Sequence, residues 1–95
     1  MSETEVFLAR VEDLSRRGGG LSALEAALVM AVGEGVARDT MSFGRIFGVG
    51  HALALRAASA LEGGLLKVVA RSPRSQRMRL ELTDAGAALH RGTAA

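Results

Sequence analysis

Hydrophobic residues near the start of the chain recur at the three- and four-residue spacing of an amphipathic helix. This stripe predicts a helix over about residues 3–16. Its apolar members are Val6, Phe7, Val11 and Leu14. Ser2 and Glu5 have the spacing of a capping box at its start. Three glycines at positions 18–20 are expected to end it.

A second helix is predicted after Ser22 and Glu25, which repeat the capping-box spacing. It extends to about residues 32–34, where Gly33 and Gly35 stop it. Its apolar members are Leu24, Ala27, Leu28, Ala31 and Val32. Because this segment is apolar nearly all round, we expect it to be the central helix of the core.

Two further helices follow with only a short turn between them. Asp39 is a good N-cap for a short helix over residues 40–47, and another helix extends from residue 51 to about residue 62. The sequence between them is Gly-Val-Gly, and a glycine directly after a short helix favours a tight turn with positive φ. Gly63 and Gly64 end the later helix.

The apolar pattern then changes its period. Residues 66–71 are rich in β-branched side chains, residues 72–76 have the composition of a turn, and residues 77–82 alternate strictly between polar and apolar. These segments predict a β-hairpin with a basic tip. A last helix is predicted over about residues 84–91, with its cap in Thr83 to Gly86.

The order of these elements predicts one mainly α (α+β) domain over residues 1–95. We expect a winged helix-turn-helix with a three-helix core and a two-stranded wing, flanked by N- and C-terminal helices. Residues 1–20 hold the first helix and its glycine stop, residues 21–91 the helix-turn-helix domain, and residues 92–95 a tail.

Charge is spread unevenly along this chain, whose formal net charge is +2. Residues 1–42 hold four Arg and seven Asp or Glu, a net charge of −3. Residues 43–95 hold eight Lys or Arg and three Asp or Glu, a net charge of +5. A basic C-terminal half favours a polyanionic partner, although a solvated basic face has the same composition.

Composition also narrows the location and the class of protein. The chain has no Cys, which excludes disulfides and thiolate metal sites and suits the cytoplasm. Its start is acidic, unlike a signal peptide, and its longest apolar run, residues 26–32, is too short to span a bilayer. We therefore expect a cytoplasmic protein without a membrane partner or cofactor. No motif favours an enzyme, and a metal site is not expected.

Residues 21–89 resemble the multiple-antibiotic-resistance regulator (MarR) family of winged-helix repressors. The most specific match is residues 82–86, Leu-Thr-Asp-Ala-Gly, which are similar to the family's Leu-Thr-Glu-Ala-Gly after the wing. Residues 43–49 resemble its Leu-Ala-x-x-Leu-Gly-Val helix and turn, and residues 72–77 its wing tip. The resemblance implies a transcriptional regulator that binds double-stranded DNA; the operator and any small-molecule effector are left open.

In a helix-turn-helix the second helix lies in the major groove of DNA. Helical phase places Ala54, Ala58 and Leu61 toward the core. The side chains then expected to face DNA are His51, Ala52, Leu55, Arg56 and Ser59. Arg45 lies on the helix expected to cross the DNA backbone. The wing is expected to reach phosphates or the minor groove with Arg71, Arg74, Arg77 and Arg79.

Two further expectations concern partners. A single small domain contacts few bases, so specific binding favours a homodimer on two half-sites. The expected dimer seam consists of Val6, Phe7, Val11, Leu14 and Leu89; alternatively, the first helix packs only on its own core. A different function remains open, because the Ala- and Leu-rich second helix also suits a winged-helix protein–protein interaction module that has lost DNA recognition.

Overall fold

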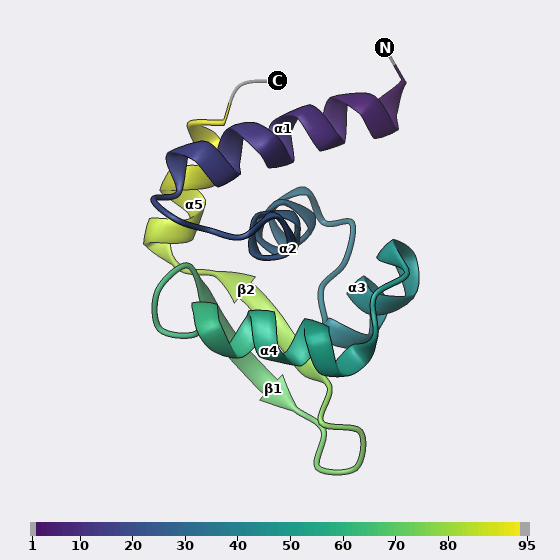
Figure 1. The fold of residues 1–95 in the computed structure, drawn as a ribbon. Helices are drawn as coiled ribbons and strands as arrows, with labels where there is room; N and C mark the ends of the chain where they lie inside the picture. The colour runs from purple at the N-terminus through teal and green to yellow at the C-terminus, as the bar shows by residue number, and fades with distance from the viewer. Residues whose placement is uncertain (1, 94–95) are drawn as a thin grey trace.

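The computed structural model describes residues 2–93, so residues 94–95 of the expected tail lie outside the described residues. Within residues 2–93 the chain forms five helices and one two-stranded antiparallel hairpin, which confirms the mainly α, α+β class (Figure 1). The elements are α1 (Glu3–Arg17), α2 (Ala23–Glu34), α3 (Thr40–Phe47), α4 (His51–Leu61), β1 (Leu66–Arg71), β2 (Met78–Leu82) and α5 (Asp84–Arg91). Their bounds lie within about one residue of the predicted ones.

The predicted helix starts are confirmed by their side-chain caps. Ser2 Oγ accepts from the Glu5 N–H at 3.1 Å, and Glu5 Oε1 accepts from the Ser2 N–H at 3.2 Å. The same reciprocal pair joins Ser22 and Glu25 at the start of α2. At α3, Asp39 Oδ1 accepts from the Ser42 N–H at 2.8 Å. Each cap satisfies backbone donors that the first helical turn leaves without a partner.

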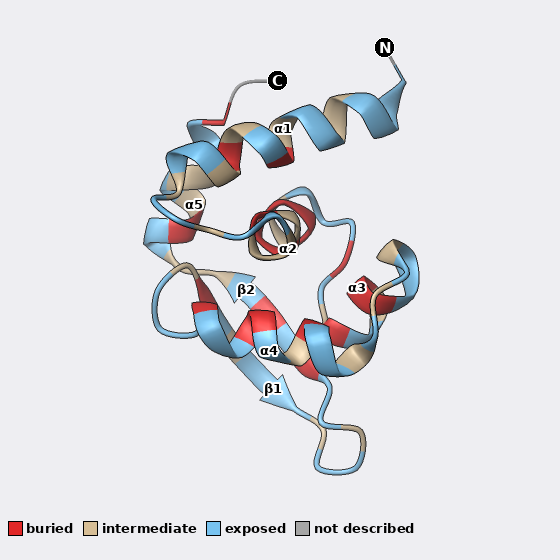
Figure 2. Ribbon diagram, in the orientation of Figure 1, coloured by how far each residue is buried: buried red, intermediate tan, exposed pale blue. Residues whose placement is uncertain are grey.

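Helix α2 passes through the middle of the molecule, with α1 on one side and the α4–hairpin layer on the other (Figure 1). Buried residues lie on the sides of the elements that face α2 (Figure 2). The largest fully buried side chains include Leu14, Leu28, Met30, Phe43 and Leu66. Each of these side chains contributes about 1.5–3 kcal/mol to stability through burial. Leu28 and Met30 belong to α2, so the prediction that the second helix is central is confirmed.

Two residues of the expected dimer seam belong to the core of the single chain, so this part of the prediction is wrong. Val11 and Leu14 are buried against the chain itself, Leu14 completely. Phe7 is half-buried and packs on Phe47 of α3, with ring centroids 5.6 Å apart. Val6 and Leu89 are also only half-buried, whereas Leu8 is 54% exposed. The physical reason is that α2 and α3 supply the apolar surface that the stripe of α1 needs.

An ionic cluster fastens α1 and α5 to the end of α2. Glu34 Oε1 lies 2.9 Å from Arg10 Nη1, and Glu34 Oε2 lies 2.5 Å from His90 Nε2. Burial acts to raise the pKa of Glu34, but the hydrogen bonds and charges of His90 and Arg10 outweigh it and hold the pKa below 4.5. The cluster therefore keeps Glu34 ionised at neutral pH.

The hairpin is attached to the helices at both of its ends. The Leu80 N–H donates to the Arg38 carbonyl at 2.8 Å, and Asp39 forms a single bridge with Arg79. At the other end, Thr83 Oγ1 donates to the Gly64 carbonyl at 2.6 Å. Gly86 is required there, because a Cβ at this position would lie 2.1 Å from the Leu65 carbonyl oxygen.

Candidate nucleic-acid interface

The turn between α3 and α4 depends on two glycines. Gly48 ends α3 in the left-handed conformation with φ 67°, which a glycine adopts without strain. A Cβ on Gly44 would lie 2.6 Å from the Val49 carbonyl oxygen, so only glycine allows the turn to fold back onto α3. The Val49 N–H donates to the Gly44 carbonyl at 2.9 Å. These contacts place the start of α4 directly beside α3.

Helix α4 has one buried face and one exposed face. Ala54, Ala58 and Leu61 are buried as predicted, and Ala57 is buried with them. The exposed side chains are Ala52, Leu53, Arg56, Ser59 and Ala60. Three residues predicted to face outward, Ala52, Arg56 and Ser59, are therefore exposed.

Leu55 is less exposed than this face, and its predicted contact with DNA stays a prediction. It is half-buried and packs against the core. Leu53, on the other flank of the helix, is 49% exposed instead. Leu53 and Leu55 flank the core-facing side of α4 at nearly equal angles, and only the flank of Leu55 is covered by the core.

His51 makes an intramolecular contact rather than lying free on the surface. Its Nε2 atom is hydrogen-bonded with Thr40 Oγ1 at 2.8 Å, and the ring is half-buried. The same Thr40 oxygen accepts from the Met78 N–H at 3.1 Å. One buried hydroxyl thus joins the first residues of α3, α4 and β2. His51 fixes the position of α4, a role that the sequence analysis did not predict.

The loop at the hairpin tip is held by its own hydrogen bonds. The Ser72 N–H donates to the Arg77 carbonyl and the Gln76 N–H to the Ser72 carbonyl, both at 2.9 Å. Gln76 adopts a positive φ of 64°, and its side-chain amide donates to the Pro73 carbonyl at 3.3 Å. Arg74 is exposed at this tip, so its guanidinium projects from an ordered loop.

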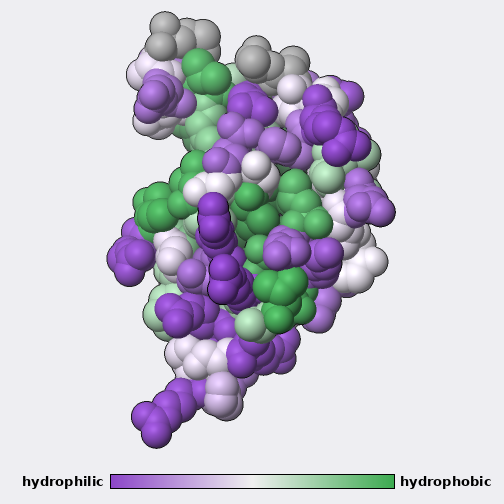
Figure 3. Space-filling model, turned by 180° about the vertical axis from the view of Figure 1, so that it is seen from behind, coloured by the Kyte–Doolittle hydropathy of each residue, from purple (hydrophilic) through white to green (hydrophobic). Residues whose placement is uncertain are grey.

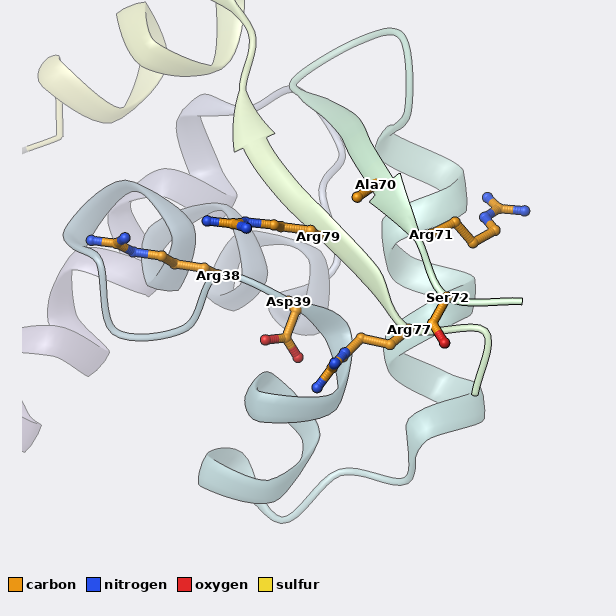
Figure 4. A pocket seen from close by; sticks show the side chains of 7 residues that line it. All are labelled: Arg38, Asp39, Ala70, Arg71, Ser72, Arg77 and Arg79. Atoms are coloured by element: carbon orange, nitrogen blue, oxygen red, sulfur yellow. The ribbon is translucent and has the colours of Figure 1, made fainter. Parts of the chain in front are cut away.

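A β-bulge divides the wing arginines between two faces of the hairpin. Lys67 lies opposite Glu81 and Val68 opposite Leu80, but the next pair is Ala70 with Arg79, which leaves Val69 as an extra residue. The bulge places Arg71 opposite the buried Met78, on the face that packs on the helices. Figure 4 shows the Arg71 side chain directed away from Arg79. The four wing arginines therefore do not form one cluster.

The arginines around α4 and the hairpin are not used for internal ion pairs. Within residues 2–93, none of these side chains has a carboxylate within 4.0 Å: Arg38, Arg45, Arg56, Arg71, Arg74, Arg77 and Arg79. All seven are exposed. A surface of unpaired guanidinium groups attracts phosphates, which accept hydrogen bonds from them in pairs.

Asp39 is a carboxylate that lines the same concavity as several of these arginines. Burial acts to raise the pKa of Asp39, but hydrogen bonds from the Ser42 backbone and hydroxyl and the charge of Arg77 lower it below 3.8. Figure 4 shows the Arg77 side chain pointing toward Asp39. Asp39 is therefore ionised, and its oxygens are occupied in capping α3.

Sequence reasoning missed one exposed residue of this region, Arg38. Arg38 lies in the segment between α2 and α3, where no periodicity indicates which way a side chain points. One open concavity of about 500 Å³ is lined by Arg38, Asp39, Ala70, Arg71, Ser72, Arg77 and Arg79, although the Arg71 side chain extends away from Arg38 and Arg79 (Figure 4). No sequence signal indicated Arg38, because it stands beside Asp39 in the half of the chain whose net charge is −3.

Neither a metal site nor a membrane helix is present in the described part of the chain. Within residues 2–93 no group of three His, Cys, Asp or Glu side chains could hold a metal ion. No helix in the same range is long and apolar enough to cross a membrane. Comparisons with family models, curated proteins and solved structures find no match to this chain. The MarR resemblance therefore stays a prediction.

Proposed function

We propose that this chain is a winged helix-turn-helix protein that binds double-stranded DNA and regulates transcription in the cytoplasm. The observation that carries the proposal is a set of exposed arginines without internal partners on α3, on α4 and on the helix side and tip of the hairpin: Arg45, Arg56, Arg71 and Arg74. Such groups release counterions when they contact phosphates, and this release supplies most of the affinity for a duplex. The α3–turn–α4 unit and the hairpin have the order that the MarR resemblance implies.

In this proposal α4 lies in the major groove with its exposed face. Arg56 is its one exposed side chain that can pair with a guanine edge through two hydrogen bonds, while Ser59 offers one hydroxyl and Ala52 can contact a thymine methyl. Arg71 lies on the helix side of the hairpin and Arg74 at its tip, so both can reach phosphates beside the same groove. Arg45 on α3 can reach the backbone on the other side.

The test begins with a preferred site selected from random duplexes. Arg56→Ala is expected to weaken binding to that site by about 1–3 kcal/mol and to change binding to random duplex much less. Arg16→Ala is the matched control, because it removes the same charge from α1, where Arg16 pairs with Asp13. If the Arg56 and Arg16 variants lose equal affinity, α4 does not recognise bases.

We also propose that the chain acts as a homodimer, since two half-sites raise the specificity of a small domain. The surface left for the seam is the half-buried Val6, Phe7 and Leu89 together with Leu8, which is 54% exposed. Light scattering of the free protein and Leu8→Glu test this seam. A monomer at every concentration, with and without duplex, contradicts it.

A second candidate function is a protein–protein interaction module. The observation that favours it is a shallow apolar concavity of about 280 Å³ between α4 and the start of α2, lined mainly by Leu24, Leu53, Ala57 and Ala60. An exposed apolar surface of this kind suits a protein partner. Leu53→Ala separates the two functions, because it removes apolar surface from the concavity without adding a charge beside Arg56. It removes partner binding if the concavity is the site, whereas an intact surface of arginines still binds duplex.

A further inference from the structure

The outer faces of α4 and of the hairpin point in opposite directions. The buried face of α4 and the buried residues Leu66, Met78 and Leu80 meet in the same core. In Figure 1 the helix lies in front of the two strands, so its exposed face looks away from them. The exposed residues of β2, Arg79 and Glu81, therefore lie on the far side of this helix–hairpin sandwich.

Two arginines dominate this far side. Arg38 and Arg79 together line the open concavity of about 500 Å³ and an adjoining one of about 240 Å³. Figure 4 shows their side chains extending in the same direction from neighbouring segments, opposite to Arg71. Their backbones are held in place, because Leu80 is hydrogen-bonded to the Arg38 carbonyl and Asp39 bridges to Arg79. The two guanidinium groups are thus presented by an ordered scaffold.

The charges around this arginine pair leave it unneutralised. Glu81 is engaged by Lys67 at 3.6 Å, and Asp39 caps α3 with Arg77 beside it. Counting Arg38, Arg77, Arg79 and Lys67 against Asp39 and Glu81 gives four positive and two negative charges, a net +2. Seen from behind, the molecule carries strongly hydrophilic side chains in a strip between hydrophobic patches (Figure 3). Such a strip suits a continuous line of phosphates.

We propose that Arg38 and Arg79 form a second duplex-binding surface, so that one chain bridges two DNA segments. The inference rests on the proposed function, which assigns the first duplex to α4, Arg71 and Arg74. The Arg38 and Arg79 side chains extend opposite to Arg71, so their guanidinium groups are not part of the surface assigned to the first duplex (Figure 4). The two concavities are open and continuous through the shared arginines, which fits a polymer backbone with one negative charge per about 1.7 Å of helix axis.

The experiment uses the full chain, a duplex immobilised on beads and a second, fluorescent duplex. Fluorescence on the beads measures bridging, and protein on the beads measures binding to the first duplex. At about 50 mM salt we expect the double variant Arg38→Ala/Arg79→Ala to keep first-duplex affinity within about threefold and to lower bridging about tenfold. Arg38→Glu alone, which reverses one charge, is expected to lower bridging at least as much.

The matched control is Arg16→Ala/Arg17→Ala, which removes the same charge from α1 and is expected to leave bridging unchanged. Circular dichroism checks that the variants fold. Bridging that survives Arg38→Ala/Arg79→Ala overturns the inference, since a dimer holding one duplex on each α4 gives that result. Wild-type protein that is retained on the beads but captures no second duplex also overturns it. Absence of any protein on the beads instead overturns the proposed function itself.

Discussion

The two ends of the molecule use arginine in opposite ways. In α1, Arg10, Arg16 and Arg17 all pair with carboxylates of the chain, on Glu34 and Asp13. Around α4 and the hairpin, seven arginines have no such partner within the described residues. Exposed ion pairs stabilise a fold only slightly, so the difference matters less for stability than for what remains available to a ligand. The arginines of the α1 end connect parts of the fold, and those of the α4–hairpin end have no carboxylate partner within the described residues.

The largest loss of stability is expected from truncating Leu14, the fully buried side chain of α1. Leu14→Ala is expected to lower the free energy of unfolding by about 2–5 kcal/mol, because Leu14 is fully buried and its loss leaves a cavity. Urea denaturation measures the change. The control Leu8→Ala, at an exposed position on the same helix, is expected to change it by less than about 0.5 kcal/mol. A loss that varies with protein concentration would instead place Leu14 in a dimer seam.

The junction between α4 and the hairpin is expected to be nearly as sensitive. Thr40→Val keeps the shape of the side chain but removes the acceptor of the buried Met78 N–H and the partner of His51. An unsatisfied buried donor costs about 1–3 kcal/mol. Thermal and urea unfolding measure this loss, with the exposed Thr4→Val as control. If both variants unfold alike, the hydroxyl does not stabilise the junction.

The arginines without ion pairs are expected to differ from the paired arginines of α1 in how much they contribute to the salt dependence of duplex binding. Arg71→Ala/Arg74→Ala is expected to reduce the slope of log affinity against log salt by about 1 per arginine, because each lost phosphate contact releases fewer counterions. The measurement is a titration of duplex at several salt concentrations. Arg16→Ala/Arg17→Ala, whose charges are paired within α1, is expected to leave the slope unchanged. Equal slopes in the wild type and the wing variant contradict a role of the wing in binding.

The smallest expected effect is pH-dependent. Glu34→Gln keeps the shape but loses the charge beside Arg10 and His90, and is expected to cost about 1 kcal/mol at neutral pH. Because folding lowers the pKa of Glu34, its contribution is fully present above pH 4.5 and is lost as the pH falls through the folded-state value. The free energies of unfolding of the wild type and of Glu34→Gln should therefore converge in acid. Glu12→Gln, on the exposed side of α1, is the control.

The elements of the fold were predictable because local signals agree with one another. The capping boxes at Ser2 and Ser22, the glycine stops and the change of apolar period mark the ends of helices and strands. The bulge was not predictable, since Val68, Val69 and Ala70 are all apolar and no alternation fixes their register. The sequence therefore indicated a basic hairpin but not that its arginines lie on two faces.

The exposed face of α4 was predicted only in part for a similar reason. Ala54, Ala58 and Leu61 set the buried side of the helix correctly, but Leu53 and Leu55 flank that side at nearly equal angles, so the pattern alone does not tell which of the two is more exposed. The contacts of Thr40 join residues that are 11 and 38 positions apart. Such contacts depend on tertiary packing, and no local pattern reports them.

If the chain binds a duplex as proposed, the Thr40 hydroxyl has a consequence for the kind of double helix that fits. By holding the first residues of α4 and β2 on one oxygen, it fixes the spacing between the helix and the wing before any ligand arrives. A helix and a wing held at a fixed spacing fit only grooves of matching width and depth, whatever the order of the bases. B-form DNA offers a wide major groove, whereas A-form RNA has a deep, narrow one that side chains cannot enter. The protein would thus select DNA over duplex RNA by shape alone.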